Sequence, residues 1–201
     1  MNSHNALGAL LVGVLVCIAT PAMAAKGFSY TYVDAGYEYV DGDESSFKLG
    51  AVNGSFDTFK YLALRAGFKR GRIEDYPPAK GSSNDPDFSE FSAGGRGHYT
   101  LIKKKLDGFA GATWFYNSIN GNNVSSNSDW GGIFDAGIRY KGFKRLELNI
   151  WVRNRTADSA SSDTVLVIGP LIRVTKKLSI NIKTSQLGDD DVYFAGMRLD
   201  L

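Results

Sequence analysis

The sequence has little cysteine, histidine or proline. Cys17 is the single cysteine in 201 residues, which excludes a disulfide framework. If the amino-terminal segment that contains it is removed, a thiolate metal site and a cysteine nucleophile are excluded as well. Zinc-ligand spacings, a glycine-rich phosphate loop and a dinucleotide fingerprint are also missing. We therefore expect no metal and no cofactor.

Strong charge of either sign is missing too. The chain carries 23 lysines and arginines against 21 aspartates and glutamates, a net charge of +2. The basic residues are scattered, and their one run, Lys103-Lys104-Lys105, is typical of a solvated turn. This distribution does not indicate a nucleic-acid partner.

The one long apolar run lies at the amino terminus. It extends from Ala6 to Thr20 and is followed by Pro21 and Ala22-Met23-Ala24. Small residues at Ala22 and Ala24 are typical of a signal-peptidase site, and the run is shorter than the roughly 20 residues of a membrane-spanning helix. We expect a signal peptide over residues 1–24 and a mature barrel domain over residues 25–201.

This segment departs from a common export signal at its start and contains the chain's cysteine. Met1 to Asn5 carries no lysine or arginine, although export signals usually begin with positive charge. Cys17 follows Val16, where a lipidation signal has a small residue, so a lipoprotein is disfavoured.

Apolar and polar residues alternate along the rest of the chain. From Arg145 to Thr156, Leu148, Ile150 and Val152 share one face, opposite Glu147 and Arg153. A β-strand produces this period of two. Ten such segments, most of them near the 9–11 residues of a tilted membrane strand, predict an all-β fold, a transmembrane antiparallel up-and-down β-barrel. The segments lie near residues 28–40, 46–55, 58–70, 88–101, 107–118, 130–141, 145–156, 164–175, 178–186 and 191–201.

The segment over 164–175 is the weakest, because Pro170 removes a ladder donor where a closed barrel has no free edge. We expect a bulge or a different boundary there, and eight strands are the alternative if 164–186 pairs differently. Connections on one side are longer, near 71–87, 119–129 and 157–163, as in the extracellular loops of outer-membrane barrels.

Alternation alone does not say which face meets lipid. A soluble barrel such as a lipocalin buries its apolar face, whereas a membrane barrel turns it outward. Aromatic residues at strand ends and many ionised groups on the opposite face favour the membrane form. The predicted interfacial aromatics are Tyr30, Tyr32, Tyr39, Tyr99, Trp114, Tyr116, Trp130, Tyr140 and Tyr193. The predicted lumen charge network is Arg65, Lys69, Glu90, Arg96, His98, Asp135, Arg139, Glu147, Arg153, Arg155 and Arg198.

Several segments carry a resemblance to a known superfamily. They are Phe28 to Val33 with Gly36-Tyr37, Gly50 to Ser55, Gly94 to Gly97, and the alternating end of the chain. Together they resemble the small proteobacterial outer-membrane β-barrel proteins, the porin-like superfamily that includes the OmpA-type membrane domain. The predicted insertion signal is Tyr193, Met197, Leu199 and Leu201, although these proteins usually end in phenylalanine.

The resemblance implies the cell outer membrane of a Gram-negative bacterium as the location. It implies outer-membrane lipid and lipopolysaccharide as partners, with the barrel assembly machinery and periplasmic chaperones during biogenesis. It implies no common ligand or reaction.

His98 is the only histidine of the predicted mature chain, with Ser92 on the same face. Outer-membrane lipid hydrolases place such a pair on a barrel wall, but no third orienting residue is evident here. We expect no catalytic site, and a structural or surface-interaction role through extracellular loops, with a lumen filled by charged side chains. A narrow porin, a soluble periplasmic lipocalin-like barrel and a lipid hydrolase are the alternatives.

Overall fold

The computed structural model describes residues 28–42, 45–74, 85–121, 124–158, 160–187 and 190–201. The predicted signal peptide, with Ala22 and Ala24, lies outside these residues. Within them, no helix has the length and apolar character needed to cross a bilayer. The strands are β1 (Tyr32–Asp41), β2 (Ser46–Phe59), β3 (Leu62–Glu74), β4 (Asp87–Ile102), β5 (Leu106–Gly121), β6 (Val124–Tyr140), β7 (Leu146–Ala157), β8 (Ala160–Arg173), β9 (Leu178–Leu187) and β10 (Asp190–Asp200).

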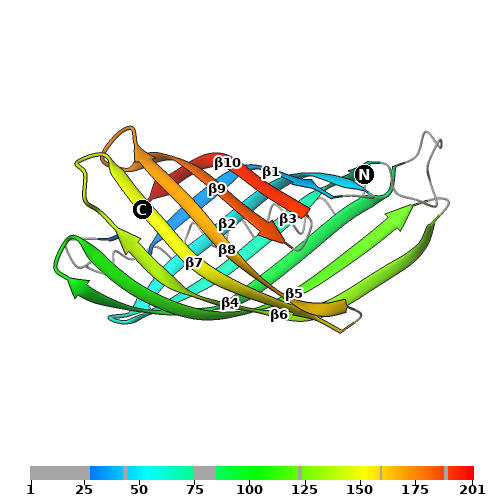
Figure 1. Ribbon diagram of the computed structural model, residues 1–201, viewed down its shortest axis with the longest axis horizontal. Coiled ribbons are helices and arrows are strands. Elements are labelled where there is room, and N and C mark those ends of the chain that lie inside the picture. The colour runs from blue at the N-terminus through cyan, green and yellow to red at the C-terminus, as the bar shows by residue number, and fades with distance from the viewer. Residues whose placement is uncertain (1–27, 43–44, 75–84, 122–123, 159, 188–189) are drawn as a thin grey trace.

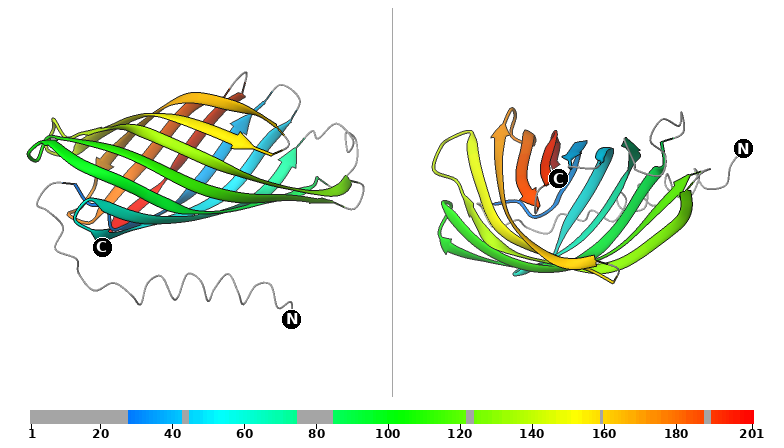
Figure 2. Two further views of the ribbon diagram at one scale, coloured as in Figure 1. Left: turned by 90° about the horizontal axis from the view of Figure 1, so that it is seen from below. Right: turned by 45° about the vertical axis from the view of Figure 1, so that its right-hand side comes forward.

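These strands form one closed sheet. Each pairs antiparallel with its neighbours in sequence, and β1 also pairs with β10, from Tyr32 with Asp200 to Asp41 with Asp191. Figure 1 shows the inclined strands, and in Figure 2 the blue β1 lies beside the red β10. Ten strands, rather than eight, are therefore confirmed. Closure matters because it leaves no unpaired edge to template aggregation.

The apolar face of each strand points outward. In β7, Val152 is 47% exposed, whereas Glu147 on the opposite face is 3% exposed. Around the barrel, the exposed large apolar side chains lie on the outer face, whereas the buried charged side chains lie inside together with a smaller set of buried apolar residues such as Phe109, Phe115 and Trp151. A transmembrane barrel has this distribution, and a soluble carrier of apolar ligands has the reverse. The predicted transmembrane up-and-down barrel is thus confirmed.

The wall is taller on one side. Strand β6 has 17 residues and β5 has 16, whereas β1 and β9 have 10 each. In Figure 1, β5 and β6 reach farther to the right than β9 and β10. The prediction of long loops over 119–129 and 157–163 is therefore wrong, because strands occupy most of both segments. Above a bilayer both faces of a strand meet water, so the alternation on which the prediction relied disappears.

Pro170 lies inside β8 without a bulge. The β8 to β9 register is the same on either side of it, since Ile168 pairs with Thr184 and Leu171 with Asn181, but pairing lapses between these positions. The side-chain amide of Asn149 donates to the carbonyl of Gly169 at 3.0 Å. The lost ladder donor is thus absorbed as a local gap. Of the two expected outcomes, the bulge is wrong, whereas the boundary does differ, because β8 spans Ala160–Arg173 rather than 164–175.

The β1 to β10 seam depends on two glycines that face each other. Gly36 pairs with Gly196, and a Cβ on Gly196 would lie 2.8 Å from the Cα of Gly36 and 2.8 Å from the ring of Phe194. Phe194 is 4% exposed and covers both glycines from the lumen, as aromatic residues do over sheet glycines elsewhere.

Gly196→Ala is therefore expected to destabilise the barrel by about 1–3 kcal/mol, the usual effect of forcing a methyl group into a packed site. The measurement is the midpoint of urea unfolding in lipid vesicles. Gly50→Ala is the matched control, because its Cβ would meet only the Arg70 carbonyl oxygen, at 3.7 Å. Equal midpoints for the two variants would contradict this view of the seam.

Candidate functional site

The lumen holds the chemistry-bearing side chains of the barrel. The structure places all eleven residues of the predicted charge network on the inner face, and it groups all of them except Arg153 into three clusters. The first surrounds Asp135 in the middle of the lumen, the second surrounds Glu90 nearer the β1 to β2 loop, and the third lies at the opposite end, near the carboxyl terminus.

Asp135 on β6 forms ion pairs with two guanidinium groups at the same time. Arg65 on β3 donates to its Oδ2 at 2.9 Å, and Arg96 on β4 bonds to the same oxygen. The Asp135 side chain is 2% exposed, and the guanidinium of Arg96 also lies 4.1 Å from the ring centroid of Phe109. One carboxylate therefore compensates two cations that come from different strands.

Glu90 on β4 forms the second cluster. Arg155 on β7 donates to it at 2.8 Å, and Lys69 on β3 lies 3.8 Å from its other oxygen. Lys69 also donates to Glu38 of β1 at 2.6 Å. The Arg155 guanidinium stacks 3.7 Å from the ring centroid of Phe115. These contacts link five strands across the lumen, β1, β3, β4, β5 and β7.

The end of the lumen near the carboxyl terminus is occupied by residues 28–31, which precede β1. The carbonyl of Ser29 accepts hydrogen bonds from Arg139 at 2.9 Å and from Arg198 at 2.7 Å. Arg139 also pairs with Glu147, its Nε lying 2.8 Å from Oε1. Two arginines of the barrel wall thus hold this segment inside.

The aromatic rings of that segment are buried with it. Phe28 is 6% exposed and Tyr30 is 2% exposed, and the Arg139 guanidinium lies 4.5 Å from the Tyr30 ring centroid. Burial raises the pKa of the Tyr30 phenol to about 12, and its hydroxyl donates to Asp107 at 3.5 Å. The phenol is therefore a neutral donor at physiological pH.

His98 belongs to the same cluster. Its ring stacks on Tyr30 with centroids 3.8 Å apart, and its Nε2 lies 3.0 Å from Asp57 Oδ1. Within the described residues, no hydrogen bond joins His98 to a serine. Ser92 lines a separate cavity farther along the barrel. The geometry is that of a packed structural histidine, and the pair that a hydrolase requires is not assembled.

Two of the predicted interfacial aromatics require correction. Tyr30 and Tyr32 lie inside the barrel, with the Arg198 guanidinium 3.7 Å from the Tyr32 ring centroid. The prediction relied on their position near a strand end. Tyr32 shares the parity of the buried Asp34, which directs it inward, and Tyr30 lies in the segment that enters the lumen before the strand begins.

The other seven predicted aromatics lie on outward positions of their strands. The tightest group is Trp130 with Trp114 and Tyr116, whose ring centroids lie 4.7 and 4.6 Å from that of Trp130. Such amphipathic rings suit the depth of lipid headgroups. The remaining members are Tyr39, Tyr99, Tyr140 and Tyr193.

The end of β10 presents the predicted insertion signal outward. Tyr193, Met197, Leu199 and Leu201 are 46%, 62%, 44% and 49% exposed. The signal itself stays a prediction.

Sequence reasoning missed several lumen charges. Asp34 accepts hydrogen bonds from Asn53 at 2.9 Å, from Asn181 at 3.0 Å and from Lys183 at 3.2 Å. Counting alternate positions back from Glu38 would have placed Asp34 on the inner face. The same count from Asn181 would have placed Lys183 there.

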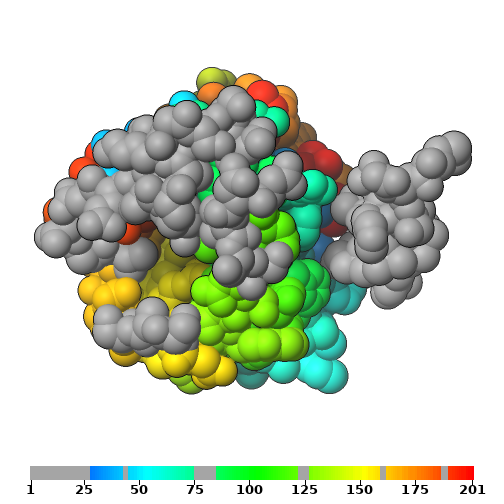
Figure 3. Space-filling model, turned by 90° about the vertical axis from the view of Figure 1, so that its right-hand side faces the viewer, coloured from blue at the N-terminus to red at the C-terminus, as the bar shows by residue number. Residues whose placement is uncertain are grey.

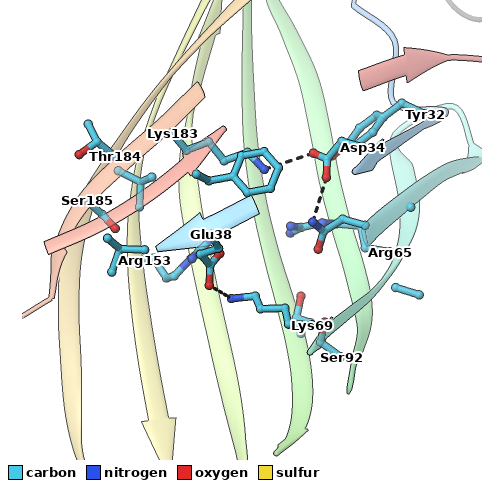
Figure 4. A pocket seen from close by; sticks show the side chains of 17 residues that line it. Tyr32, Asp34, Glu38, Arg65, Lys69, Ser92, Arg153, Lys183, Thr184 and Ser185 are labelled. Atoms are coloured by element: carbon cyan, nitrogen blue, oxygen red, sulfur yellow. Dashed lines mark hydrogen bonds and ion pairs between the residues drawn. The ribbon is translucent and has the colours of Figure 1, made fainter. Parts of the chain in front are cut away.

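A cavity of about 100 Å³ lies between these clusters. Its lining includes Glu38, Lys69 and Val192, which place it toward the end where β1 is joined to β2. Figure 4 shows Arg65, Lys69, Arg153 and Lys183 around it, with dashed lines from Lys69 to Glu38 and from Lys183 to Asp34. Figure 3 views the molecule from this end, where the ends of the green β5 and the yellow β7 form part of the rim.

A second cavity of about 60 Å³ adjoins the first on the side of Arg139 and Arg198, and Arg65, Arg153 and Lys183 line both. The lumen is therefore subdivided by ionic side chains.

No family model matches the chain, and no curated protein matches it in sequence. Among solved structures, it is similar to Neisserial surface protein A, with 12% identity, a TM-score of 0.45, and coverage of 85% of this chain and 96% of that one. The KdgM porin shares 11% identity, with a TM-score of 0.40 and coverage of 85% and 99%. The translocator domain of the autotransporter NalP from Neisseria meningitidis shares 9% identity, with a TM-score of 0.52 and coverage of 98% of both chains. At this identity the likeness concerns the fold alone, which is a closed transmembrane β-barrel.

Proposed function

We propose that the protein is a non-enzymatic β-barrel of the Gram-negative outer membrane that does not form an open pore and that acts through its loop end. The apolar side chains on the outer face of its strands would contact outer-membrane lipid and lipopolysaccharide. The observation that carries the proposal is the occupied lumen. Residues 28–31 fill one end, and ion pairs from facing strands cross the middle.

The alternatives fit the arrangement less well. A lipocalin-like carrier needs an apolar interior, but the lumen here is lined by paired charges. A lipid hydrolase needs a serine that is activated by a histidine, whereas His98 is engaged by Tyr30 and Asp57. A narrow porin is the strongest competitor, because small cavities lie between the ionic clusters.

Planar-bilayer recording separates a closed barrel from a porin. The wild-type protein is expected to show no large, steady openings. A variant with Phe28→Ala and Tyr30→Ala removes two buried rings from the occupied end and is expected to conduct measurably. Phe59→Ala with Tyr61→Ala is the matched control, because these rings are 68% and 51% exposed outside the lumen.

Steady openings of the wild type would replace this proposal with a pore.

The location of the protein is tested separately on membrane fractions. A membrane barrel stays folded in SDS until boiled and then shifts on a gel, whereas a soluble barrel fractionates with the periplasm.

A further inference from the structure

The middle of the lumen carries more positive than negative charge. Within the described residues, its ion-pair clusters and the cavity between them bring together six cationic side chains and four carboxylates. The cations are Arg65, Lys69, Arg96, Arg153, Arg155 and Lys183, and the carboxylates are Asp34, Glu38, Glu90 and Asp135. The excess of two positive charges lies on the inner face of the barrel, where the side chains are largely buried and an uncompensated charge is costly.

Among these cations, Arg153 is the side chain whose positive charge no carboxylate pairs with in the described residues. Lys69 and Lys183 each pair with a carboxylate, and Arg65 shares Asp135 with Arg96. Arg153 forms no ion pair in the part of the chain that the structure describes. Its Nε is buried without a hydrogen-bond partner, and its aromatic contact is distant, 5.9 Å from its guanidinium to the Trp151 ring centroid. A buried donor without an acceptor in a folded protein calls for a partner.

The unpaired guanidinium lines the cavity of about 100 Å³. Arg65 and Lys69 reach that cavity from β3, Lys183 from β9 and Arg153 from β7, so cations converge on it from three strands. One water needs only about 10–15 Å³ on the same measure. The space therefore accommodates a tetrahedral anion together with a few waters.

We propose that this cavity binds a small divalent oxyanion of the phosphate or sulfate type, with Arg153 as its principal ligand. A guanidinium presents two parallel N–H donors to such oxygens, and charge-assisted hydrogen bonds of this kind are the strong ones. Arg65 and Lys183 add positive potential from opposite walls. A lipid headgroup is excluded because the closed sheet separates the lumen from the bilayer, and a long polyanion exceeds the volume.

Isothermal titration calorimetry with inorganic phosphate tests the site, on folded protein in detergent and in a chloride buffer of constant ionic strength. The wild type is expected to give saturable heat for one site. Arg153→Met is expected to weaken binding about tenfold or more, because it removes charge-assisted bonds. Arg153→Lys, which keeps the charge, is expected to fall between them.

Arg70→Met is the matched control, because Arg70 lies outside the lumen with a side chain 61% exposed and a pair to Asp87 at 3.7 Å. It is expected to bind phosphate as the wild type does. If Arg153→Met does not fold, the wild type still decides the question. Its unfolding midpoint must rise in phosphate relative to chloride at equal ionic strength, as binding to the native state requires.

Three results would overturn the proposal. They are the absence of saturable heat up to about 10 mM phosphate, equal affinity of the wild type and Arg153→Met, and a loss of affinity in Arg70→Met as large as that in Arg153→Met.

Discussion

Replacing Asp135 by asparagine is expected to lower the free energy of unfolding by about 3–5 kcal/mol, the range seen when one partner of a buried ion pair is removed. The Asp135 side chain is 2% exposed and compensates both Arg65 and Arg96. Asparagine keeps the shape but leaves two guanidinium groups facing each other without a counter-charge. Urea unfolding in lipid vesicles, followed by tryptophan fluorescence, measures the effect.

Asp87→Asn is the matched control. Asp87 pairs with Arg70 at 3.7 Å, and both side chains are more than half exposed. Exposed pairs contribute about 0–1 kcal/mol, so this variant is expected to unfold close to the wild type. Similar losses for the two aspartates would mean that the Asp135 cluster is as solvated as the surface.

A double-mutant cycle isolates the pairing from the loss of a side chain. Adding Arg96→Met to Asp135→Asn removes one of the two cations that the single variant leaves without a counter-charge. The combined cost is therefore expected to fall short of the sum of the single costs by about 0.5–3 kcal/mol, the range for residues in direct contact. Simple additivity would show that the pair is not coupled.

The second large effect is expected on the outer face. Val152 is 47% exposed in the middle of β7, and Val152→Arg places a charge in the band that we assign to lipid. Such a substitution costs about 2–4 kcal/mol at the bilayer midplane and about 0–1 kcal/mol near the interfaces. The unfolding free energy in lipid vesicles is expected to fall by the larger amount.

Phe143→Arg is the control for that experiment. Phe143 is 69% exposed in the turn between β6 and β7, where the charged group reaches water. A small loss at both positions would indicate that Val152 faces water, and the membrane assignment would then fail.

The sequence predicts strand positions well where the two faces of a strand lie in different environments. Leu148, Ile150 and Val152 alternate with Glu147 and Trp151, because lipid and lumen select opposite side chains, and the structure has this division. The alternation of apolar and polar residues disappears where both faces of a strand lie in the same environment. Beyond the bilayer, Ser128 pairs with Ser118 within a continuing ladder, although the polar residues over 119–129 are typical of a loop.

The partners within the lumen could not be predicted. Arg65 and Asp135 are 70 positions apart, and Arg96 meets the same carboxylate because Gly111 of β5 pairs with both Arg96 and Asp135 and places no side chain between them. Alternation states that a side chain points inward, but it does not state which inward side chain lies opposite. For the same reason, the unpaired state of Arg153 was not foreseen.

The segment over residues 28–31 was misassigned for a different reason. Its aromatic residues resemble an interfacial girdle in composition, yet Tyr30 is 2% exposed within the lumen. Rings that contact arginine and rings that contact headgroups are chemically alike. Only their position relative to the start of β1 at Tyr32 distinguishes them.

A nitroxide scan of β7 in lipid vesicles tests the orientation of the wall most directly. Single cysteines are introduced from Leu148 to Val152 in a background without Cys17, and collision with oxygen and with a water-soluble nickel chelate is measured by electron paramagnetic resonance. We expect oxygen accessibility to peak at Leu148, Ile150 and Val152 and to fall at Asn149 and Trp151, with little nickel contact at the peaks. Strong nickel contact at Leu148, Ile150 and Val152 would place the apolar face in water and contradict the account.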